Sequence, residues 1–351
     1  MTDQFFTEKQ GAAAMKHAIL KRYLPGFVGA TGSTSTDHVV YYIDGYSGPG
    51  QYDDGEAGSP MIALALAEAM SEQRSLRGVC IESDPMHYQK LADLLDGVDG
   101  WEAMLGTAEV CLPVALKRTA GRPVFVFLDP FGVKQMPFET VRNVLLRGST
   151  KTEVLVRIDT TGLKRIAGHL TSPHRNEATL ANNDRFLGGP WWRSLESVGT
   201  DGFIHDIVDE YVRRLRDKSG GFGYFRFPIS EKPGGVPKYS LVHFTQWNGA
   251  TWKMNEAISM SRQDARDAVI EPTLFDIDDD NWIGEIADNV MKILTDTDSF
   301  IPQDSINALF GNVLGHARET HVRQAFNRLY ADEQISTDPK GKKLPRLRVY
   351  R

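Results

Sequence analysis

A short glycine-rich segment follows an apolar stretch near the start of the chain and reads Asp44-Gly45-Tyr46-Ser47-Gly48-Pro49-Gly50. Glycines between a strand and a helix permit a tight turn and let a ligand approach the backbone closely. The dinucleotide fingerprint needs a third glycine and free N–H groups for a pyrophosphate, but Asp53 stands at the third position and Pro49 has no N–H. These departures, with the acid before the loop, favour a sulfonium- and ammonium-bearing cofactor, S-adenosylmethionine. The structural alternative is a simple turn.

Two further positions fit the same cofactor. Glu82 ends the second apolar stretch, where an acid can accept hydrogen bonds from both ribose hydroxyls. NAD enzymes also place an acid there, so Glu82 indicates a nucleoside cofactor without naming it. Asp84 is the neighbouring candidate, and helix capping is the structural alternative. Ser59 is expected to cap a helix that starts at Pro60, and this helix N-terminus favours the cofactor's carboxylate.

The tetrad Asp129-Pro130-Phe131-Gly132 follows the most apolar stretch of the chain. Ligands of open α/β sheets bind at the carboxyl ends of the strands. The Asp129 carboxylate and the carbonyl before the proline can accept two hydrogen bonds from one amine, which orients that amine toward a methyl group on sulfur. Phe131 is placed to stack on a nucleobase that has left its duplex. The structural alternative is an acid that ends a strand before a proline turn.

Several basic and aromatic residues are candidate contacts to a nucleic-acid substrate. Phosphate contacts of this kind are independent of sequence and sensitive to salt. Trp191 is a candidate base platform, with packing of a lid as the structural alternative. For the basic residues, the alternative is solvated surface charge. The basic candidates are Arg157 and Arg165 after the fifth strand, and Arg323, Lys342 and Arg346 near the carboxyl end.

The order of apolar stretches predicts the elements that position these residues. Strands alternate with helices and show no polar alternation, which is typical of a parallel sheet covered on both faces. Two later strands separated by a Gly-Pro-rich loop predict a hairpin that adds one reversed strand. The first helix is expected to end at Pro25-Gly26. The expected strands are His38–Ile43, Arg77–Ile81, Glu102–Leu105, Pro123–Leu128, Thr152–Ile158, Tyr224–Ile229 and Tyr239–Trp247.

These patterns predict an α/β, Rossmann-like domain over residues 1–255, with residues 160–220 as a lid or substrate region. Residues 256–284 are expected to form a linker with an acidic stretch. Residues 285–351 show three helical patterns and two short strand candidates, Ile335–Thr337 and Arg346–Tyr350. Three helices and a basic hairpin are typical of a winged helix-turn-helix.

Composition limits the function classes. The 351 residues carry a net charge of −6, so the whole surface is no polycation, but the segment from Lys340 to Arg351 has six basic residues and no acid. Nucleic-acid binding is therefore expected at one appendage and one pocket. Cys80 and Cys111 exclude a disulfide scaffold and indicate buried thiols, and the histidines show no metal spacing. No apolar run is long enough to span a membrane, and no signal peptide is visible, so a cytoplasmic protein is expected.

The set of motifs resembles the three-Cys-motif partner family, TcmP, over about residues 10–250. The motifs include Tyr42-Ile43-Asp44-Gly45-Tyr46-Ser47-Gly48-Pro49-Gly50, Gly58-Ser59-Pro60, Ile81-Glu82 and Phe127-Leu128-Asp129-Pro130-Phe131-Gly132. More broadly, the chain resembles class I S-adenosylmethionine-dependent nucleic-acid methyltransferases. The resemblance implies that Asp44, Tyr46, Gly48 and Gly50 line the cofactor, that Glu82 holds its ribose, and that Asp129 to Gly132 hold the target amine. Many such enzymes hold the adenine amine with an acid after the third strand. This chain has Gly106-Thr107-Ala108, so Thr107 or a main-chain group is expected there.

The first hypothesis is therefore an S-adenosylmethionine-dependent methyltransferase that acts on an exocyclic amine of a nucleobase in DNA or RNA. The second is a non-catalytic partner of a three-cysteine, radical-SAM-like protein in a phage or defence locus, which also binds nucleic acid. The third is a DNA-binding regulator that uses residues 285–351.

Overall fold

The computed structural model describes residues 3–35, 37–130, 132, 136–147, 151–218, 222–229, 237–267 and 279–351. The chain divides into two compact units. The first contains Met1–Ala13 and Leu24–Gln246, and the second contains Ala14–Tyr23 and Trp247–Arg351. Among the described residues, no helix combines the length and the apolar character that a membrane crossing requires.

The first unit is built on a seven-stranded sheet with the order β3-β2-β1-β4-β5-β7-β6. Strands β1 to β5 pair in parallel, and β7 is antiparallel to both β5 and β6. This confirms the predicted mostly parallel sheet with one reversed strand. The strand order changes direction between β1 and β4, and in open α/β sheets ligands bind at the carboxyl ends of strands at such a point. The strands are β1 (Val39–Asp44), β2 (Ser75–Glu82), β3 (Trp101–Leu105), β4 (Val124–Leu128), β5 (Thr152–Ile158), β6 (Gly223–Ile229) and β7 (Tyr239–Thr245).

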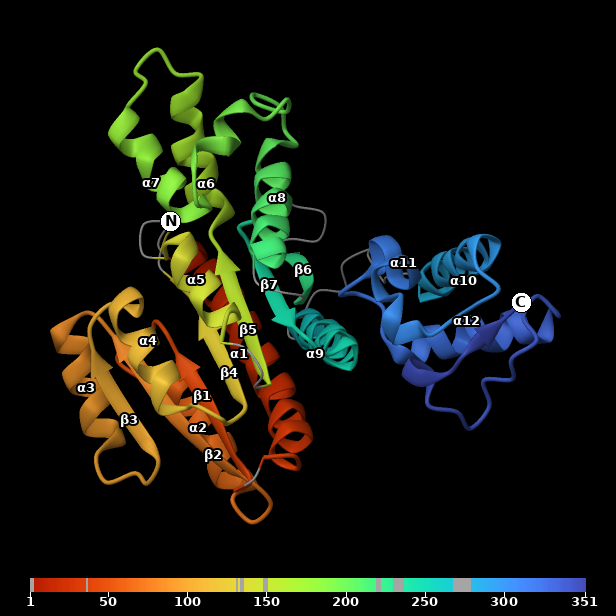
Figure 1. Ribbon diagram of the computed structural model, residues 1–351, viewed down its shortest axis with the longest axis horizontal. Coiled ribbons are helices and arrows are strands. Elements are labelled where there is room, and N and C mark those ends of the chain that lie inside the picture. Colours follow the sequence, from red (N-terminus) through yellow and green to blue (C-terminus); the bar gives the residue numbers. More distant parts are fainter. Residues whose placement is uncertain are drawn as a thin grey trace. The chain divides into compact units, whose positions relative to one another are not determined.

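Helices cover both faces of this sheet (Figure 1). All five residues of β4 are buried, because Val126 and its neighbours on one face join a cluster with α4, α5 and α8, while Phe125 on the other face packs against Phe27 of α1. Cys80 and Cys111 are free, buried thiols. The helices of this unit are α1 (Asp3–Gly32) apart from Ala14–Tyr23, α2 (Ser59–Met70), α3 (Pro85–Leu95), α4 (Ala108–Arg118), α5 (Phe138–Leu145), α6 (Thr160–Ala167), α7 (Glu177–Leu187) and α8 (Phe203–Lys218).

The first helix does not end at Pro25-Gly26 as predicted. It continues through Pro25 to Gly32, although a proline inside a helix removes one backbone hydrogen bond. Phe27 and Val28 are buried at 3% and 0% exposure. Burial of these side chains offsets the lost bond, and local sequence does not reveal that packing.

Residues 160–218 form helices α6, α7 and α8, which extend past the carboxyl ends of the central strands (Figure 1). Their side chains belong to the same core cluster as β4. The Phe186 and Tyr211 rings stack with centroids 4.9 Å apart, and an ion pair joins Arg185 of α7 to Glu109 of α4. The predicted lid region is therefore a packed helical layer of the first unit.

The second unit contains α9 (Asn248–Asp267), α10 (Asp279–Asp296), α11 (Ile306–Phe310) and α12 (Glu319–Ala331). The segment predicted as a linker from residue 256 thus begins inside α9. This helix is packed within its unit, because Asn255 Nδ2 donates to the Ala317 carbonyl at 2.9 Å and Trp252 contacts Phe310. Residues 268–278, which hold most of the predicted acidic stretch, lie outside the described residues.

The carboxyl-terminal strands differ from the predicted hairpin. β9 (Val349–Tyr350) pairs antiparallel with β8 (Ser299–Phe300), and residues 335–337 are not a strand. Ser336 N still donates to the Tyr350 carbonyl at 3.2 Å, so this segment runs beside β9. The pairing with β8 is non-local, which explains why the sequence pattern did not predict it.

Candidate functional site

Three acids from distant parts of the chain gather at the carboxyl edge of the sheet. Asp44 ends β1, Glu82 ends β2, and Asp129 follows β4. The register aligns Asp44 with Cys80 of β2 on one side and with Phe127 of β4 on the other. The parallel topology therefore places the acids around one crevice, as the sequence analysis expected.

The Asp44 carboxylate is fully buried and held by three donors. The Tyr42 hydroxyl and the Ser59 hydroxyl donate to its Oδ2 at 2.9 and 2.6 Å, and the Tyr46 N–H donates to Oδ1 at 3.0 Å. Burial raises the pKa of the Asp44 carboxyl to about 6; the three hydrogen bonds lower it, and the negative charge of Asp129 raises it. Asp44 is therefore a buried carboxylate that gains from a nearby cation.

Glu82 is fixed against the glycine-rich loop. The Gly48 N–H donates to Glu82 Oε2 at 2.7 Å, and the Asp84 N–H donates to Oε1 at the same distance. Gly48 has a φ of +62°, a conformation that favours glycine. Asp84, by contrast, caps α3 by accepting from Met86 N and His87 N. The helix-capping alternative thus applies to Asp84, and Glu82 faces the loop.

The start of α2 differs by one residue from the prediction. Gly58 is the N-cap and makes no side-chain cap, while Ser59 is the first helical residue. The Ser59 hydroxyl donates to Asp44 instead of capping its own helix. Gly58 provides no side-chain acceptor for the first turn of α2, so the positive end of the helix dipole there favours an anion.

The remaining predicted cofactor residues occupy different surroundings. The Tyr46 ring packs against the core cluster; burial, with the charge of Glu109, raises the pKa of its hydroxyl. Tyr46 therefore contributes its main chain to the loop. Ser47 is buried, and its N–H donates to the Ile81 carbonyl at 2.9 Å. Thr107 is exposed at the start of α4. The Gly106 N–H donates to the Glu82 carbonyl at 2.9 Å, which brings this turn beside β2.

Asp129 and Pro130 are both contacted by Arg157. Arg157 Nη1 donates to the Pro130 carbonyl at 2.9 Å and lies 3.5 Å from Asp129 Oδ1. One nitrogen therefore reaches both oxygens, so the two acceptors converge on one point. The carbonyl expected from the sequence is the one before the proline, whereas the convergent carbonyl is that of Pro130 itself. Gly132 has a φ of +159°, and Phe131 lies outside the described residues.

The other predicted substrate residues are more scattered. Arg165 is exposed on α6. Trp191 is half-buried; its Nε1 donates to the Leu187 carbonyl at 3.0 Å, and Arg214 lies 4.6 Å from its ring centroid. In the second unit, Arg323 donates to the carbonyls of Pro339 and Lys342 at 3.2 and 3.1 Å. Arg323 thus holds a basic loop in place, and Lys342 and Arg346 on that loop are exposed.

Three tyrosines near the site were missed by the sequence analysis. Tyr42 bonds Asp44, and its position two residues earlier on the same strand was an available signal because side chains alternate along a strand. Burial and the charges of Asp129 and Asp44 raise the pKa of Tyr52, which lies in the same loop. Tyr239 supports Arg157 from the reversed strand, with 4.9 Å between the guanidinium carbon and the ring centroid. No local pattern indicates that contact.

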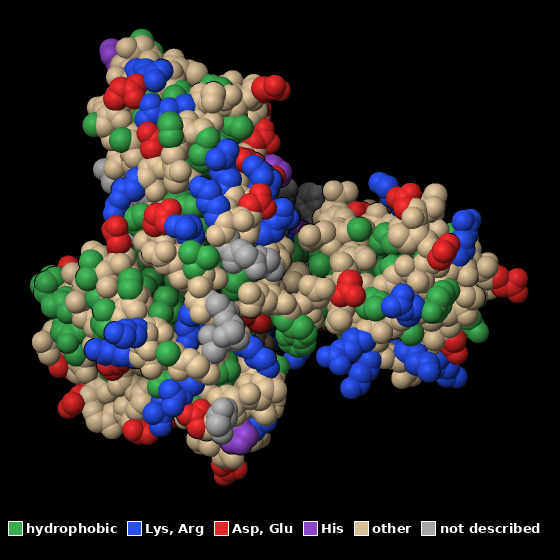
Figure 2. All heavy atoms as spheres, viewed as in Figure 1, with side chains coloured by type: hydrophobic (Ala, Val, Ile, Leu, Met, Phe, Trp, Pro, Cys, Tyr) green, Lys and Arg blue, Asp and Glu red, His purple; other side chains and the backbone are tan. Residues whose placement is uncertain are grey.

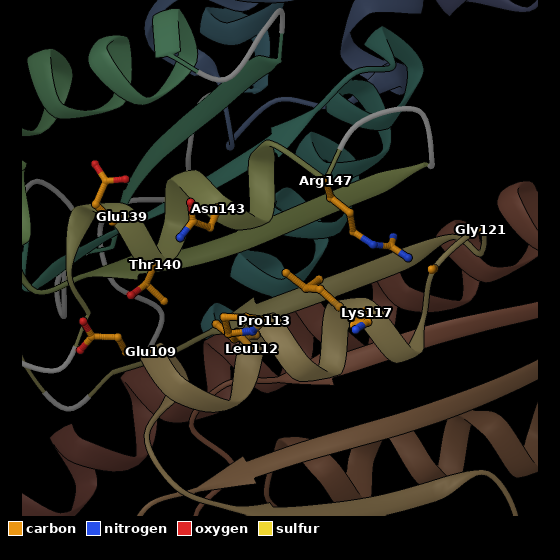
Figure 3. Close-up of a pocket in the computed structure, with 11 residues that line it drawn as sticks. Glu109, Leu112, Pro113, Lys117, Gly121, Glu139, Thr140, Asn143 and Arg147 are labelled. Atoms are coloured by element: carbon orange, nitrogen blue, oxygen red, sulfur yellow. The ribbon is translucent and has the colours of Figure 1, made fainter.

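A groove of about 550 Å³ lies apart from the strand ends, between α4 and α5 (Figure 3). Glu109 and Glu139 stand at one end, and Lys117 and Arg147 at the other. Arg147 donates to the Arg122 carbonyl and to Thr152 Oγ1 at 3.1 and 3.2 Å, so its charge serves the fold. Among the described residues, no group of three His, Cys, Asp or Glu side chains is placed to hold a metal ion.

No protein-family model matches the chain, and no curated protein matches it. One similar solved structure is the plantazolicin methyltransferase BamL with a triazolic desmethylPZN analog and SAH, at 11% identity and TM-score 0.38 over 70% of this chain and 90% of that one. A putative rRNA-methylase from Clostridium thermocellum has 12% identity and TM-score 0.34 over 58% and 87%. A fibrillarin/Nop5p complex has 10% identity and TM-score 0.32 over 60% and 72%. These identities and scores are too low to define an activity for this chain.

The pKa of Asp44 predicts a pH-dependent stability. Because its folded-state pKa of about 6 lies above its ordinary value of 3.8, the folded chain holds this proton more tightly than the unfolded chain. The stabilisation that the folded state gains from this proton is fully present below about pH 4 and is lost as the pH rises through 6. Between pH 5 and pH 8 we expect this group to lower the free energy of unfolding by about 1–2 kcal/mol.

The measurement compares urea unfolding of the native chain and Asp44→Asn at both pH values. Asparagine does not titrate, so the difference in the free energy of unfolding between the two proteins isolates the carboxyl. An identical pH slope in both proteins would contradict a raised pKa at this position.

Proposed function

We propose that the first unit binds S-adenosylmethionine at the carboxyl ends of β1 and β2. The observation that carries the proposal is the arrangement of Asp44 and Glu82 around the loop at residues 45–50. Asp44 offers a buried negative charge to the cationic methionine part, and the positive end of the α2 dipole, which has no side-chain cap from Gly58, favours its carboxylate. Among the described residues, Glu82 Oε2 accepts only the Gly48 N–H and keeps a second lone pair for a ribose hydroxyl, whereas Oε1 accepts from the Asp84 N–H and, at 3.5 Å, from the Ser83 hydroxyl. The donor set therefore fits this cofactor.

The loop is less suited to a pyrophosphate. A dinucleotide needs several N–H groups aimed at its phosphates, but the Gly48 N–H donates to Glu82 and Pro49 has none. A buried Asp44 carboxylate beside the loop would also repel phosphate. These contacts favour S-adenosylmethionine over NAD.

The tetrad after β4 supports the second part of the proposal, methyl transfer to an exocyclic amine of a nucleobase in DNA or RNA. When bound, S-adenosylmethionine supplies an electrophilic methyl group on a positively charged sulfur. The Asp129 carboxylate and the Pro130 carbonyl converge on one nitrogen position. Hydrogen bonds from both N–H groups to these oxygens fix the orientation of the amine. The oxygens also stabilise the positive charge that develops on the nitrogen.

The second unit supports nucleic-acid docking by a winged-helix-like arrangement. The exposed side of α12 carries Gln324, Asn327 and Arg328, side-chain types that bond base edges. Lys and Arg side chains gather along one edge of this unit (Figure 2), and the basic loop near Lys342 is tied to α12 by Arg323. These features favour a phosphate-binding loop beside a reading helix.

One observation favours the alternative function, a non-catalytic partner of a three-cysteine protein. Hydrophobic side chains gather on the surface around β3, α3 and α4 (Figure 2). Met86 is 73% exposed and Val110 is 68% exposed. Exposed apolar patches mark protein contacts. Co-purification with the three-cysteine protein, without methyl transfer to DNA or RNA, would favour this alternative. The similarity to the three-Cys-motif partner family rests on sequence motifs alone.

Calorimetry with S-adenosylmethionine and, separately, with NAD tests the cofactor. We expect binding of S-adenosylmethionine only, and at least a tenfold loss of affinity in Glu82→Gln, because a charged acceptor for the ribose is removed. Asp53→Asn is the matched control, since Asp53 lies in the same loop with its side chain 95% exposed. Absence of binding by the native chain would defeat the proposal.

Asp129→Ala tests the amine site. Incubation with labelled cofactor and bacterial DNA or RNA, followed by digestion to nucleosides, measures transfer. We expect a loss of roughly 100-fold or more with cofactor affinity nearly unchanged. Asp129→Asn keeps one acceptor oxygen and should retain more activity than the alanine variant. An active Asp129→Ala protein would refute the role assigned to this carboxylate.

Removal of Lys342 and Arg346 tests the docking unit. In Lys342→Ala/Arg346→Ala, nucleic-acid affinity should fall and the slope of log affinity against log salt should decrease by about 1 per lost phosphate contact. Lys292→Ala is the control, because Lys292 is exposed on α10. Fluorescence anisotropy with labelled duplex DNA and RNA measures both quantities, and equal slopes in all three proteins would exclude these contacts.

A further inference from the structure

Arg157 is held in place from two sides. It is the penultimate residue of β5 and pairs with Leu241 of the reversed strand β7. Its guanidinium carbon lies 4.9 Å from the ring centroid of Tyr239, a residue only 1% exposed. The Tyr239 ring of the reversed strand therefore packs against the guanidinium by a cation–π contact, and the arginine extends across the sheet edge toward β4.

The position that Arg157 reaches is the one proposed for the target nitrogen. Its Nη1 donates to the Pro130 carbonyl at 2.9 Å and lies 3.5 Å from Asp129 Oδ1. A guanidinium nitrogen and an exocyclic amine are both planar N–H donors. Two nitrogens cannot share this point, so an entering amine must displace Nη1.

Displacement has an electrostatic cost that depends on the ligand. The Arg157 side chain is 23% exposed and that of Asp129 is 14% exposed, so separating them leaves a partly desolvated cation without its acceptors. A free nucleoside brings no negative charge to compensate. A phosphate beside the base does, because guanidinium binds phosphate in a bidentate manner.

An unused donor of Arg157 also favours its movement from the two oxygens to a phosphate. Within the described part of the chain, Arg157 Nε is buried and has no hydrogen-bond partner. The resting position thus leaves one donor of the fork unused, and a phosphate that met two edge nitrogens would satisfy it.

We propose that Arg157 is a specificity-determining residue that occupies the amine site until a phosphate draws it away. The site then admits a base that is part of a phosphate-bearing strand and disfavours the free nucleoside. This inference rests on the proposed role of the Asp129 and Pro130 oxygens as amine acceptors.

Binding measurements test it without requiring methyl transfer. Calorimetry in saturating S-adenosylhomocysteine measures the binding affinity of three ligand classes. These are the nucleosides adenosine, cytidine and guanosine, their 5′-monophosphates, and short single-stranded oligonucleotides. In the native chain, strands should bind tighter than nucleosides. In Arg157→Ala, nucleoside affinity should rise about tenfold and strand affinity should fall by a similar factor. The three ligand classes distinguish a free nucleotide from a strand as the source of phosphate.

Two variants control for charge and folding. Arg118→Ala removes an exposed cation from α4 and should match the native chain. Arg157→Met keeps an unbranched side chain over Tyr239. If Arg157→Ala is unstable, Arg157→Met should show the rise in nucleoside affinity and the fall in strand affinity in its place. Unchanged or weaker nucleoside binding in a folded Arg157 variant overturns the inference. Increased nucleoside binding supports it even where no methyl transfer occurs, so its failure is distinct from failure of the proposed activity.

Discussion

The burial of the Asp44 carboxylate is the constraint on which the rest of the site depends. A fully buried acid requires donors, and Tyr42, Ser59 and the Tyr46 N–H provide them. These bonds join the end of β1 to its own strand, to the following loop and to the start of α2. The same contacts therefore settle the loop conformation and the direction of α2. Loss of this carboxylate would release three parts of the crevice at once.

Three acids lie at the strand ends, and the chemistry of each depends on the hydrogen-bond donors or cations that stabilise its negative charge. Asp44 has hydroxyl and amide donors, and its burial raises its pKa. Glu82 accepts two backbone N–H groups. Asp129 has the guanidinium of Arg157 as a neighbour. A cationic ligand near Asp44 would add a positive charge to the hydrogen bonds that already stabilise this carboxylate. An amine near Asp129 would take the place of the Arg157 guanidinium.

The second unit contains a local cluster of cations. The cations after Asp338 lie in a loop that Arg323 fixes to α12, whereas the acids of the first unit line the strand ends. The net charge of −6 thus conceals a local basic surface.

Residue patterns alone predict the strands of the first unit, their mostly parallel arrangement and the acids at their ends. Each strand is a local apolar run, and the parallel topology carries Asp44, Glu82 and Asp129 to one edge whatever the side-chain packing. The tertiary structure alone decided the contacts that depend on neighbours distant in sequence. These include the passage of α1 through Pro25, the pairing of β9 with β8, and the seat of Arg157 on Tyr239 against Pro130. Such contacts arise because buried area and electrostatic compensation are properties of the assembled sheet, and no local pattern of residues encodes which distant side chain will provide them.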